Sequence, residues 1–278
     1  MIIGSHISTK GNLVKMIQSV IDLDMNTFQY FTRNPRGGSA RKLYDEEIAE
    51  YKRILNHSNI KAVVAHLPYT VNLASSTKKT RNFGKKTLYE DIRRANIVQS
   101  DCLVMHPGSH VKNSLDDGIK YIVEGISFAL DTYKGDTKLC LETMSGKGTE
   151  IGRSLDEIRL ILEGLGWPEE VGICLDSCHL FASGYDFRNK MEVTRLINDL
   201  ESKIGLERVL LTHLNDSKES FDSNKDRHEN IGKGLIGIDG IRNYLKNSLI
   251  SKLPIVLETP VKDESEYLKE IELIKSLF

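Results

Sequence analysis

Residues 171–179, VGICLDSCH, contain the pattern that decides the fold of this chain. The run Val171–Leu175 has the length and composition of a buried strand, and Asp176, a potential metal ligand, follows it directly. Similar apolar runs recur along the whole chain, eight in all: Ile2–Ser5, Asn26–Phe31, Ile60–Ala65, Cys102–Met105, Leu139–Leu141, Val171–Leu175, Val209–Thr212 and Ile255–Leu257.

Segments with helical periodicity lie between these runs. The first has apolar residues at i, i+3, i+4, i+7 and i+8, which is one buried face of a helix: Leu13, Met16, Ile17, Val20 and Ile21. Weaker patterns are Leu155, Ile158 and Leu162, and Tyr267, Ile271 and Ile274. Eight strands alternating with helices predict an α/β protein with a (β/α)8 TIM-barrel fold, with the active site at the C-terminal ends of the strands.

The structural alternative is a doubly wound open sheet. That fold usually has a Gly-rich phosphate turn after its first strand, and GSHISTKG at residues 4–11 is not such a turn. No Ser/Gly/Pro-rich linker divides the chain, so we expect residues 1–278 to form a single barrel domain.

The composition is that of a soluble globular protein, with 40% hydrophobic and 28% charged residues. No run approaches the roughly 20 apolar residues of a membrane span, and the N-terminus does not resemble a signal peptide. We therefore expect an intracellular, cytoplasmic protein with no membrane partner. The four cysteines lie in or beside apolar runs, which favours buried, reduced thiols over disulfides.

The formal net charge of −1 argues at first against a nucleic-acid partner. Basic residues nevertheless gather in two stretches without acids: Arg33, Arg36, Arg41 and Lys42, and Lys78, Lys79, Arg81, Lys85 and Lys86. Taken alone, either stretch is more often a solvated surface. Both follow predicted strands, however, and so belong on the face of the barrel where the strands end.

Six consecutive runs end on, or one residue before, a potential metal ligand: His66, His106, Glu142, Asp176, His213 and Glu258. Three further candidates lie just beyond strand ends: His179, Asp226 and His228. Any one of them alone is more often a hydrogen-bonded structural residue. Six in register would converge on the barrel axis, and the crowded carboxylates would repel one another unless cations neutralised them.

Imidazoles and carboxylates favour zinc, with manganese or iron possible at one position. Because a catalytic zinc uses about three protein ligands, nine candidates indicate two or three metals. Of the remaining histidines, His6 ends the first strand and is interpreted as a supporting or substrate-contacting residue. We expect His110 at the rim of the site and His57 in solvent.

The chain resembles the endonuclease IV family along nearly its whole length. The resemblance rests on motifs in the same order: GSHIS, HLPY, HPGSH, LETMSGKGTEIG, ICLDSCHLFASGYD, HLNDSK, DRHENIGKGLIG and LETP. It implies three zinc ions. One would be held by His66, His106 and Glu142, a second by Glu142, Asp176, His213 and Glu258, and a third by His179, Asp226 and His228.

The family is the AP endonuclease class of base excision repair, and the resemblance implies its reaction. That reaction is hydrolysis of the phosphodiester 5′ to an abasic site, leaving a 3′-hydroxyl and a 5′-deoxyribose phosphate, together with trimming of blocked 3′ ends. Glu142 would be the catalytic residue, beside the attacking hydroxide. Three Zn²⁺ would change the formal charge from −1 to about +5, which favours a phosphate-rich partner.

The implied partner is double-stranded DNA that contains abasic sites or blocked 3′ ends, bound by a monomer. Arg36 and Tyr69 stand where the family inserts side chains into the DNA stack. The chain departs from the family pattern at Thr70, where Leu is frequent, at Asp222, where Gly is common, and at Ser177, where Thr is usual. None of the three is an implied ligand.

Two other functions fit parts of the pattern. Sugar isomerases and epimerases on xylose isomerase-type barrels also place His, Glu and Asp at strand ends, but they use fewer metals and lack the DRH loop. A DNA-damage binder that has lost catalysis would lack ligands, and here all nine are present.

Overall fold

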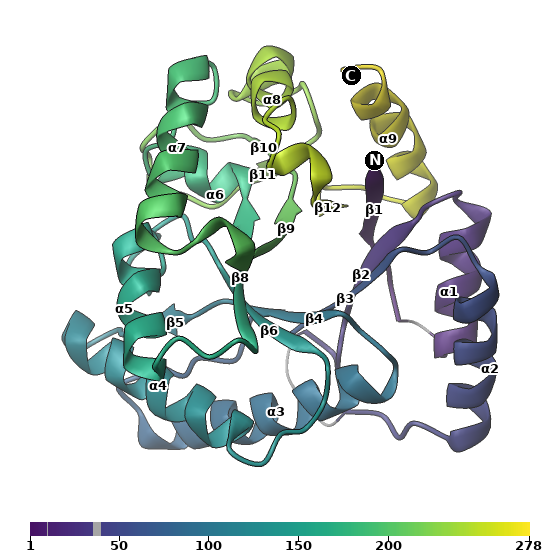
Figure 1. Cartoon of the computed structure of the whole chain (residues 1–278), viewed down its shortest axis with the longest axis horizontal. Helices are drawn as coiled ribbons and strands as arrows, with labels where there is room; N and C mark the ends of the chain where they lie inside the picture. Colours follow the sequence, from purple (N-terminus) through teal and green to yellow (C-terminus); the bar gives the residue numbers. More distant parts are fainter. Residues whose placement is uncertain (10, 36–39) are drawn as a thin grey trace.

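The computed structural model describes residues 1–9, 11–35 and 40–278, and its centre is a closed barrel of parallel strands (Figure 1). The order around the barrel is β1-β12-β9-β8-β6-β4-β3-β2. The strands are β1 Ile2–His6, β2 Thr27–Phe31, β3 Ala62–His66, β4 Cys102–Met105, β6 Lys138–Glu142, β8 Val171–Asp176, β9 Val209–His213 and β12 Pro254–Leu257. This confirms the predicted TIM barrel and excludes the open sheet.

Helices form a ring around the outside of the barrel (Figure 1). They are α1 Leu13–Asp22, α2 Asp45–His57, α3 Lys78–Ile97, α4 Leu115–Leu130, α5 Leu155–Leu165, α7 Lys190–Lys203, α8 Gly237–Leu245 and α9 Tyr267–Lys275. The short helix α6 Ser177–Ala182 instead follows β8 directly and lies at the barrel mouth beside β10. The described residues also form the 3₁₀ turns η1 Leu206–Arg208, η2 Ile250–Lys252 and η3 Glu264–Glu266. No helix in the described part of the chain is long and apolar enough to cross a membrane.

Helix α1 shows how the apolar pattern becomes packing. Asn12 caps it by accepting a hydrogen bond from the amide of Lys15, and Leu13, Met16, Ile17 and Val20 are buried. Each fully buried apolar side chain contributes about 1.5–3 kcal/mol. Ile21, expected on the same face, is instead 39% exposed. At 3.6 residues per turn it lies roughly 80° from the first residue of the stripe, at its edge.

The apolar core has two parts. The larger one lies between the barrel wall and the helices. The smaller one fills the inside of the barrel and is formed by Val64, Cys102, Val104, Cys140, Cys174, Leu211 and Val256. The interior is therefore packed and is not a pore, which leaves the mouth of the barrel as the place for chemistry. All four cysteines are buried and unpaired, as predicted.

Two small antiparallel sheets extend the barrel where its strands end. β5 (Gly108–Ser109) pairs with β7 (Glu150–Ile151), and β10 (Asp216–Ser217) pairs with β11 (His228–Glu229). In the second sheet Ser217 is opposite His228. This pairing folds the loop after β9 back over the barrel mouth and thereby brings Asp226 and His228 to the strand ends.

Candidate metal centre

The nine ligand-type residues predicted from the sequence meet at the C-terminal ends of the strands. Their ligand atoms form three groups, in each of which all the atoms lie within 4.8 Å of one another: His66, His106 and Glu142; Glu142, Asp176, His213 and Glu258; and His179, Asp226 and His228. These groups have the same members as the three ligand sets that the family resemblance implies. Glu142 belongs to two of them.

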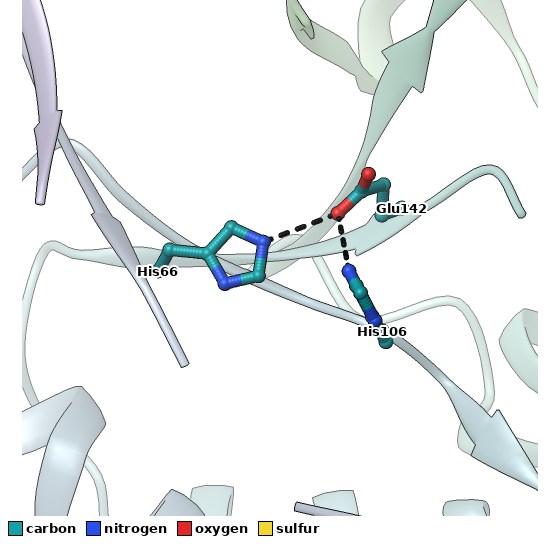
Figure 2. Close-up of side chains that lie close together, drawn as sticks. All are labelled: His66, His106 and Glu142. Atoms are coloured by element: carbon teal, nitrogen blue, oxygen red, sulfur yellow. Dashed lines mark hydrogen bonds and ion pairs between the residues drawn. The ribbon is translucent and has the colours of Figure 1, made fainter. Parts of the chain in front are cut away.

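The first group has two imidazoles pointing at one carboxylate oxygen (Figure 2). The Nε2 atoms of His66 and His106 lie 3.2 Å and 3.3 Å from Oε2 of Glu142. Nδ1 of His66 is 2.6 Å from the carbonyl oxygen of Leu67 and donates to it. The lone pair of His66 is therefore on Nε2, on the side of the shared carboxylate.

The second group lies on the other oxygen of Glu142. Oε1 of Glu142 is 3.3 Å from Nδ1 of His213. The same nitrogen lies 3.2 Å from Oε2 of Glu258 and 3.9 Å from Oδ2 of Asp176. Since its two oxygens face different groups, Glu142 has the placement of a carboxylate that bridges two cations.

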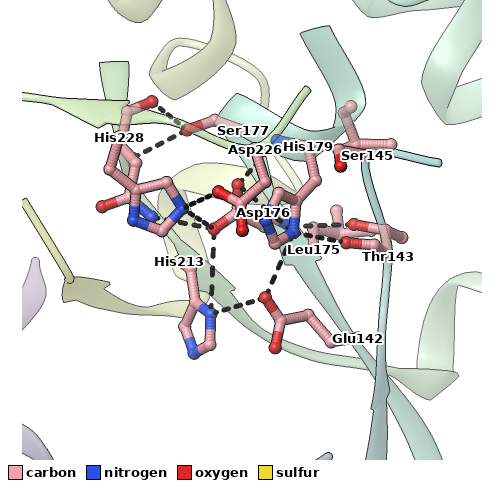
Figure 3. Close-up of polar contacts among 12 residues, drawn as sticks. Glu142, Thr143, Ser145, Leu175, Asp176, Ser177, His179, His213, Asp226 and His228 are labelled. Atoms are coloured by element: carbon pink, nitrogen blue, oxygen red, sulfur yellow. Dashed lines mark hydrogen bonds and ion pairs between the residues drawn. The ribbon is translucent and has the colours of Figure 1, made fainter. Parts of the chain in front are cut away.

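The third group gives the strongest indication of a cation site. The Nε2 atoms of His179 and His228 are buried and make no hydrogen bond within the described residues. They lie 3.3 Å and 3.4 Å from the same oxygen of Asp226 (Figure 3). A buried ring nitrogen without a hydrogen bond is costly, and coordination of a metal would remove that cost.

Cys178 is an alternative ligand near this group, because its thiol lies with Asp176 and His228 in a further cluster. Burial raises the pKa of the Cys178 thiol to about 12, which favours the neutral thiol over the thiolate that binds metal. The nitrogen and oxygen donors alone suffice for zinc, manganese or iron. The residues present therefore fit a centre of several such ions.

The electrostatics of the centre require compensation. Burial acts to raise the pKa of Glu142, but the imidazoles of His213 and His106 hold that pKa well below its usual range. Burial acts to lower the pKa of His179, yet Asp176 and Asp226 hold it well above its usual value. Protons on the imidazoles and bound cations are thus alternative ways to neutralise the same carboxylates.

Two buried amides support the ligands, and neither was predicted from the sequence. Gln29 on β2 bonds both Glu258 and His213. Nδ2 of Asn215 donates to Oδ2 of Asp176 at 2.8 Å, and Oδ1 of Asn215 accepts from the amide of Glu258 at 3.0 Å. Such partners fix the orientation of a metal ligand.

The histidines outside the three ligand groups differ in how close they lie to the centre. His6 is partly buried, with Nδ1 4.0 Å from Oε1 of Glu258, and burial lowers its pKa to about 4. His6 thus lies beside the ligand Glu258, a position that fits the supporting role, one of the two roles interpreted from the sequence. Nδ1 of His110 lies 2.6 Å from the carbonyl of Asn113, away from the ligand groups. His57 is exposed, as expected.

The predicted DNA contacts are only partly described. Tyr69 is 52% exposed just beyond β3, and its ring meets the edge of Phe31 at a centroid distance of 6.2 Å. Phe31 in turn contacts the ring of His66 at 5.4 Å. Tyr69 therefore stands at the rim of the centre with about half of its surface exposed. Arg36 lies outside the described residues.

The two basic stretches separate into structural and exposed residues. Arg33 is buried in ion pairs, and Arg81 bonds the carbonyls of Ser75 and Ser76 and covers the ring of Tyr121. Lys78 and Lys79, in contrast, are exposed at the start of α3. The number of basic residues in the two stretches therefore overstates the positive charge that is available to a phosphate backbone, because Arg33 and Arg81 make contacts that stabilise the fold.

The departures from the family pattern leave the ligand groups intact. Asp222, which stands where glycine is common, has φ 56°. The backbone thus adopts the left-handed conformation that glycine favours, and aspartate is one of the few residues that tolerate it. Ser177 donates to the carbonyl of Asn215 at 2.7 Å, a bond that a threonine hydroxyl also provides. Thr70 is exposed at the rim beside Tyr69.

Comparison with known proteins places the chain among related barrels. Residues 17–277 match the model of the xylose isomerase-like TIM barrel family. The chain is 40% identical over 276 residues to a protein of Clostridium beijerinckii named probable endonuclease 4, covering 99% of this chain and 98% of that protein.

Two solved structures show how widely this fold is shared. The crystal structure of endonuclease IV from Thermus thermophilus has a TM-score of 0.87 at 24% identity and covers 100% of this chain and 98% of that one. A D-tagatose 3-epimerase-like protein has a TM-score of 0.72 at 17% identity, covering 100% of this chain and 98% of that one. The fold alone therefore does not separate nucleases from sugar epimerases, and the sequence relationship does.

Proposed function

We propose a function from one premise: this chain belongs to the endonuclease IV family of xylose isomerase-like TIM barrels. The chain is a hydrolase of that family, an AP endonuclease that acts on DNA. More specifically, it hydrolyses the phosphodiester 5′ to an abasic site in double-stranded DNA. It also removes phosphate or sugar fragments that block 3′ ends. One domain, residues 1–278, acts as a monomer.

The observation that carries this proposal is the position of Glu142 between two ligand groups, with a third group adjacent. We assign three divalent ions to these groups, zinc in the main, with manganese acceptable at one of them. The donor set supports this assignment, since each group offers imidazoles and carboxylates whose ligand atoms lie within 4.8 Å of one another. The orphaned nitrogens of His179 and His228 support it independently.

Bound ions of this kind lower the pKa of a water and stabilise charge on the scissile phosphate and on the departing 3′ oxygen. The protein residues supply the geometry. Glu142, buried and held ionised, orients the attacking water through its carboxylate and joins the first two groups. The ring of His66 is oriented by the carbonyl of Leu67, so the nitrogen that would hold a metal already faces Glu142.

Lesion recognition is assigned to the rim. Tyr69, exposed and supported by Phe31, fills the gap left by the missing base, together with Arg36. Stacking of this kind is worth about 1–3 kcal/mol per base. Lys78 and Lys79 attract the backbone phosphates, which position the duplex without reading its sequence.

The decisive experiment uses a labelled duplex with a single tetrahydrofuran abasic analogue. Purified protein should cut once, 5′ to the analogue, and leave a 3′-hydroxyl that a polymerase extends. An undamaged duplex should remain intact, and a chelator should stop the cut until zinc is restored. Absence of the cut in zinc-replete protein would refute the proposed function. Epimerisation of a ketohexose by the same sample would indicate the sugar-epimerase alternative.

A further inference from the structure

Gln29 lies in the middle of β2 with none of its surface exposed. Its side chain reaches across the barrel mouth to residues on two other strands and to one residue just beyond a third. Nε2 is 2.6 Å from Oε1 of Glu258, beyond β12, and 3.1 Å from Nδ1 of His6 on β1. Oε1 is 2.8 Å from Nε2 of His213 on β9.

The partners fix the orientation of this amide. An ionised carboxylate accepts hydrogen bonds and donates none, so the NH2 group of Gln29 must face Glu258. The oxygen of the amide then faces His213, and Nε2 of His213 must carry the hydrogen. Nδ1 of His213, which lies 3.3 Å from Glu142 and 3.2 Å from Oε2 of Glu258, is therefore the nitrogen that is left to bind a metal.

The hydrogen bonds of Gln29 within the described residues serve the centre and not the barrel wall. Its side chain bonds two ligand residues and His6, and no backbone group in that part of the chain. Thr27, two residues earlier on the same strand and equally buried, bonds the backbone carbonyl of Ala62 instead. A buried amide is costly unless fully bonded, and an apolar side chain would fill this position more cheaply if only the fold mattered.

We propose that Gln29 is a positioning residue for the group Glu142, Asp176, His213 and Glu258. It selects the nitrogen of His213 that binds the metal, and it occupies Oε1 of Glu258 so that Oε2 faces the ion. This inference rests on the proposed function, because it needs a metal in that group. Partners of this kind typically change metal affinity by about 10–100-fold.

The first test compares Gln29→Met with Thr27→Val. Both variants replace a buried polar side chain of β2 by an apolar one of similar volume, and only the first removes contacts to the ligands. Zinc affinity is measured by competition with a chromophoric chelator. We expect Gln29→Met to weaken one class of zinc by about 10–100-fold, while Thr27→Val remains within about twofold of wild type. Equal affinities for Gln29→Met and wild type would overturn the inference.

The second test needs no variant and therefore does not depend on the folding of one. Long-range ¹H–¹⁵N NMR of the zinc-loaded wild type reports which ring nitrogen of His213 carries hydrogen. We expect hydrogen on Nε2 and metal on Nδ1, and the opposite arrangement would overturn the inference. A wild type that binds no zinc would refute the proposed function as well. Zinc binding with the wrong tautomer, or without any dependence on Gln29, would refute this inference alone.

Discussion

The guanidinium of Arg33 lies buried against the carboxylate of Asp91, with Nε 2.8 Å from Oδ2. Thr32 donates to the same carboxylate at 2.6 Å. Thr32 and Arg33, two consecutive residues after β2, thus both bind Asp91 of helix α3, and Arg33 also pairs with Glu90 of the same helix. The arginine counted in the sequence as part of a basic stretch is therefore a structural element of the barrel mouth.

Asp91→Ala should lower the free energy of unfolding by about 3 kcal/mol, because it removes the buried carboxylate that bonds both Arg33 and Thr32 and leaves the guanidinium with the half-exposed Glu90. Chemical denaturation measures this loss directly. Arg53→Ala is the control, since it breaks the exposed pair with Glu50 and should leave the stability essentially unchanged. Equal stability of wild type and Asp91→Ala would show that the ion pair is not what fastens the segment after β2.

The sequence predicts the ligand residues well but not the residues that hydrogen-bond them, for a physical reason. Strand ends converge in a barrel, so His66, Glu142 and His213 could be placed together from periodicity alone. Gln29 is in the middle of a strand, between Phe28 and Tyr30, and belongs to no ligand-type pattern. The available signal was a large polar residue between two aromatic residues of a predicted strand.

Contacts between residues far apart in the chain are the second feature that the sequence patterns do not predict. Arg33 and Asp91 are separated by 58 residues, and no local pattern connects a loop after one strand with a helix after the next. Basic residues were therefore counted as a stretch, although burial and pairing remove Arg33 from the surface. The same limit applies to Asn215, whose role follows from its contacts to Asp176 and Glu258.

Metal content is the prediction that follows from the three ligand groups. Elemental analysis of gently purified protein should give about three ions per chain, mostly zinc. Removal of the ions by dialysis against a chelator should abolish cleavage and lower the thermal midpoint, because ions that bind the folded chain add their binding free energy to its stability. A reproducible content of one ion or less in fully active protein would contradict the trinuclear assignment.

Glu142→Gln should nearly abolish cleavage while the barrel stays folded, since the change removes the charge shared by two ligand groups. DNA binding should survive, because phosphate contacts come from the surrounding loops. Single-turnover kinetics provide the measurement, with Glu157→Gln as a control: Glu157 is a buried glutamate that accepts from the amide of Gly152 and is in none of the ligand groups. A loss below about tenfold, or 1.4 kcal/mol, would mean that Glu142 is not the bridging residue.

Salt dependence should identify the phosphate contacts. The logarithm of the DNA-binding constant should fall linearly with the logarithm of the salt concentration, by about 0.9 per contact. Replacing Lys78 and Lys79 together by Ala should flatten that slope. The matched control replaces Lys61 and Lys138, which are exposed just before β3 and at the start of β6, at the opposite end of the barrel. If both double variants gave the wild-type slope, Lys78 and Lys79 would be solvated surface residues.

Tyr69 separates lesion recognition from chemistry, because it stands at the rim and is in none of the ligand groups. Tyr69→Ala removes a stacking surface and should slow abasic-site incision by roughly 10- to 100-fold. Removal of a 3′ phosphate from a nicked end requires less distortion of the duplex, so it should be slowed much less. Phe128→Ala, which removes a similarly exposed aromatic ring from α4 on the outer ring of helices, should affect neither reaction. Equal losses in both reactions of Tyr69→Ala, together with lost metal or a lower thermal midpoint, would show that Tyr69 supports the metal centre through Phe31 and does not probe the DNA.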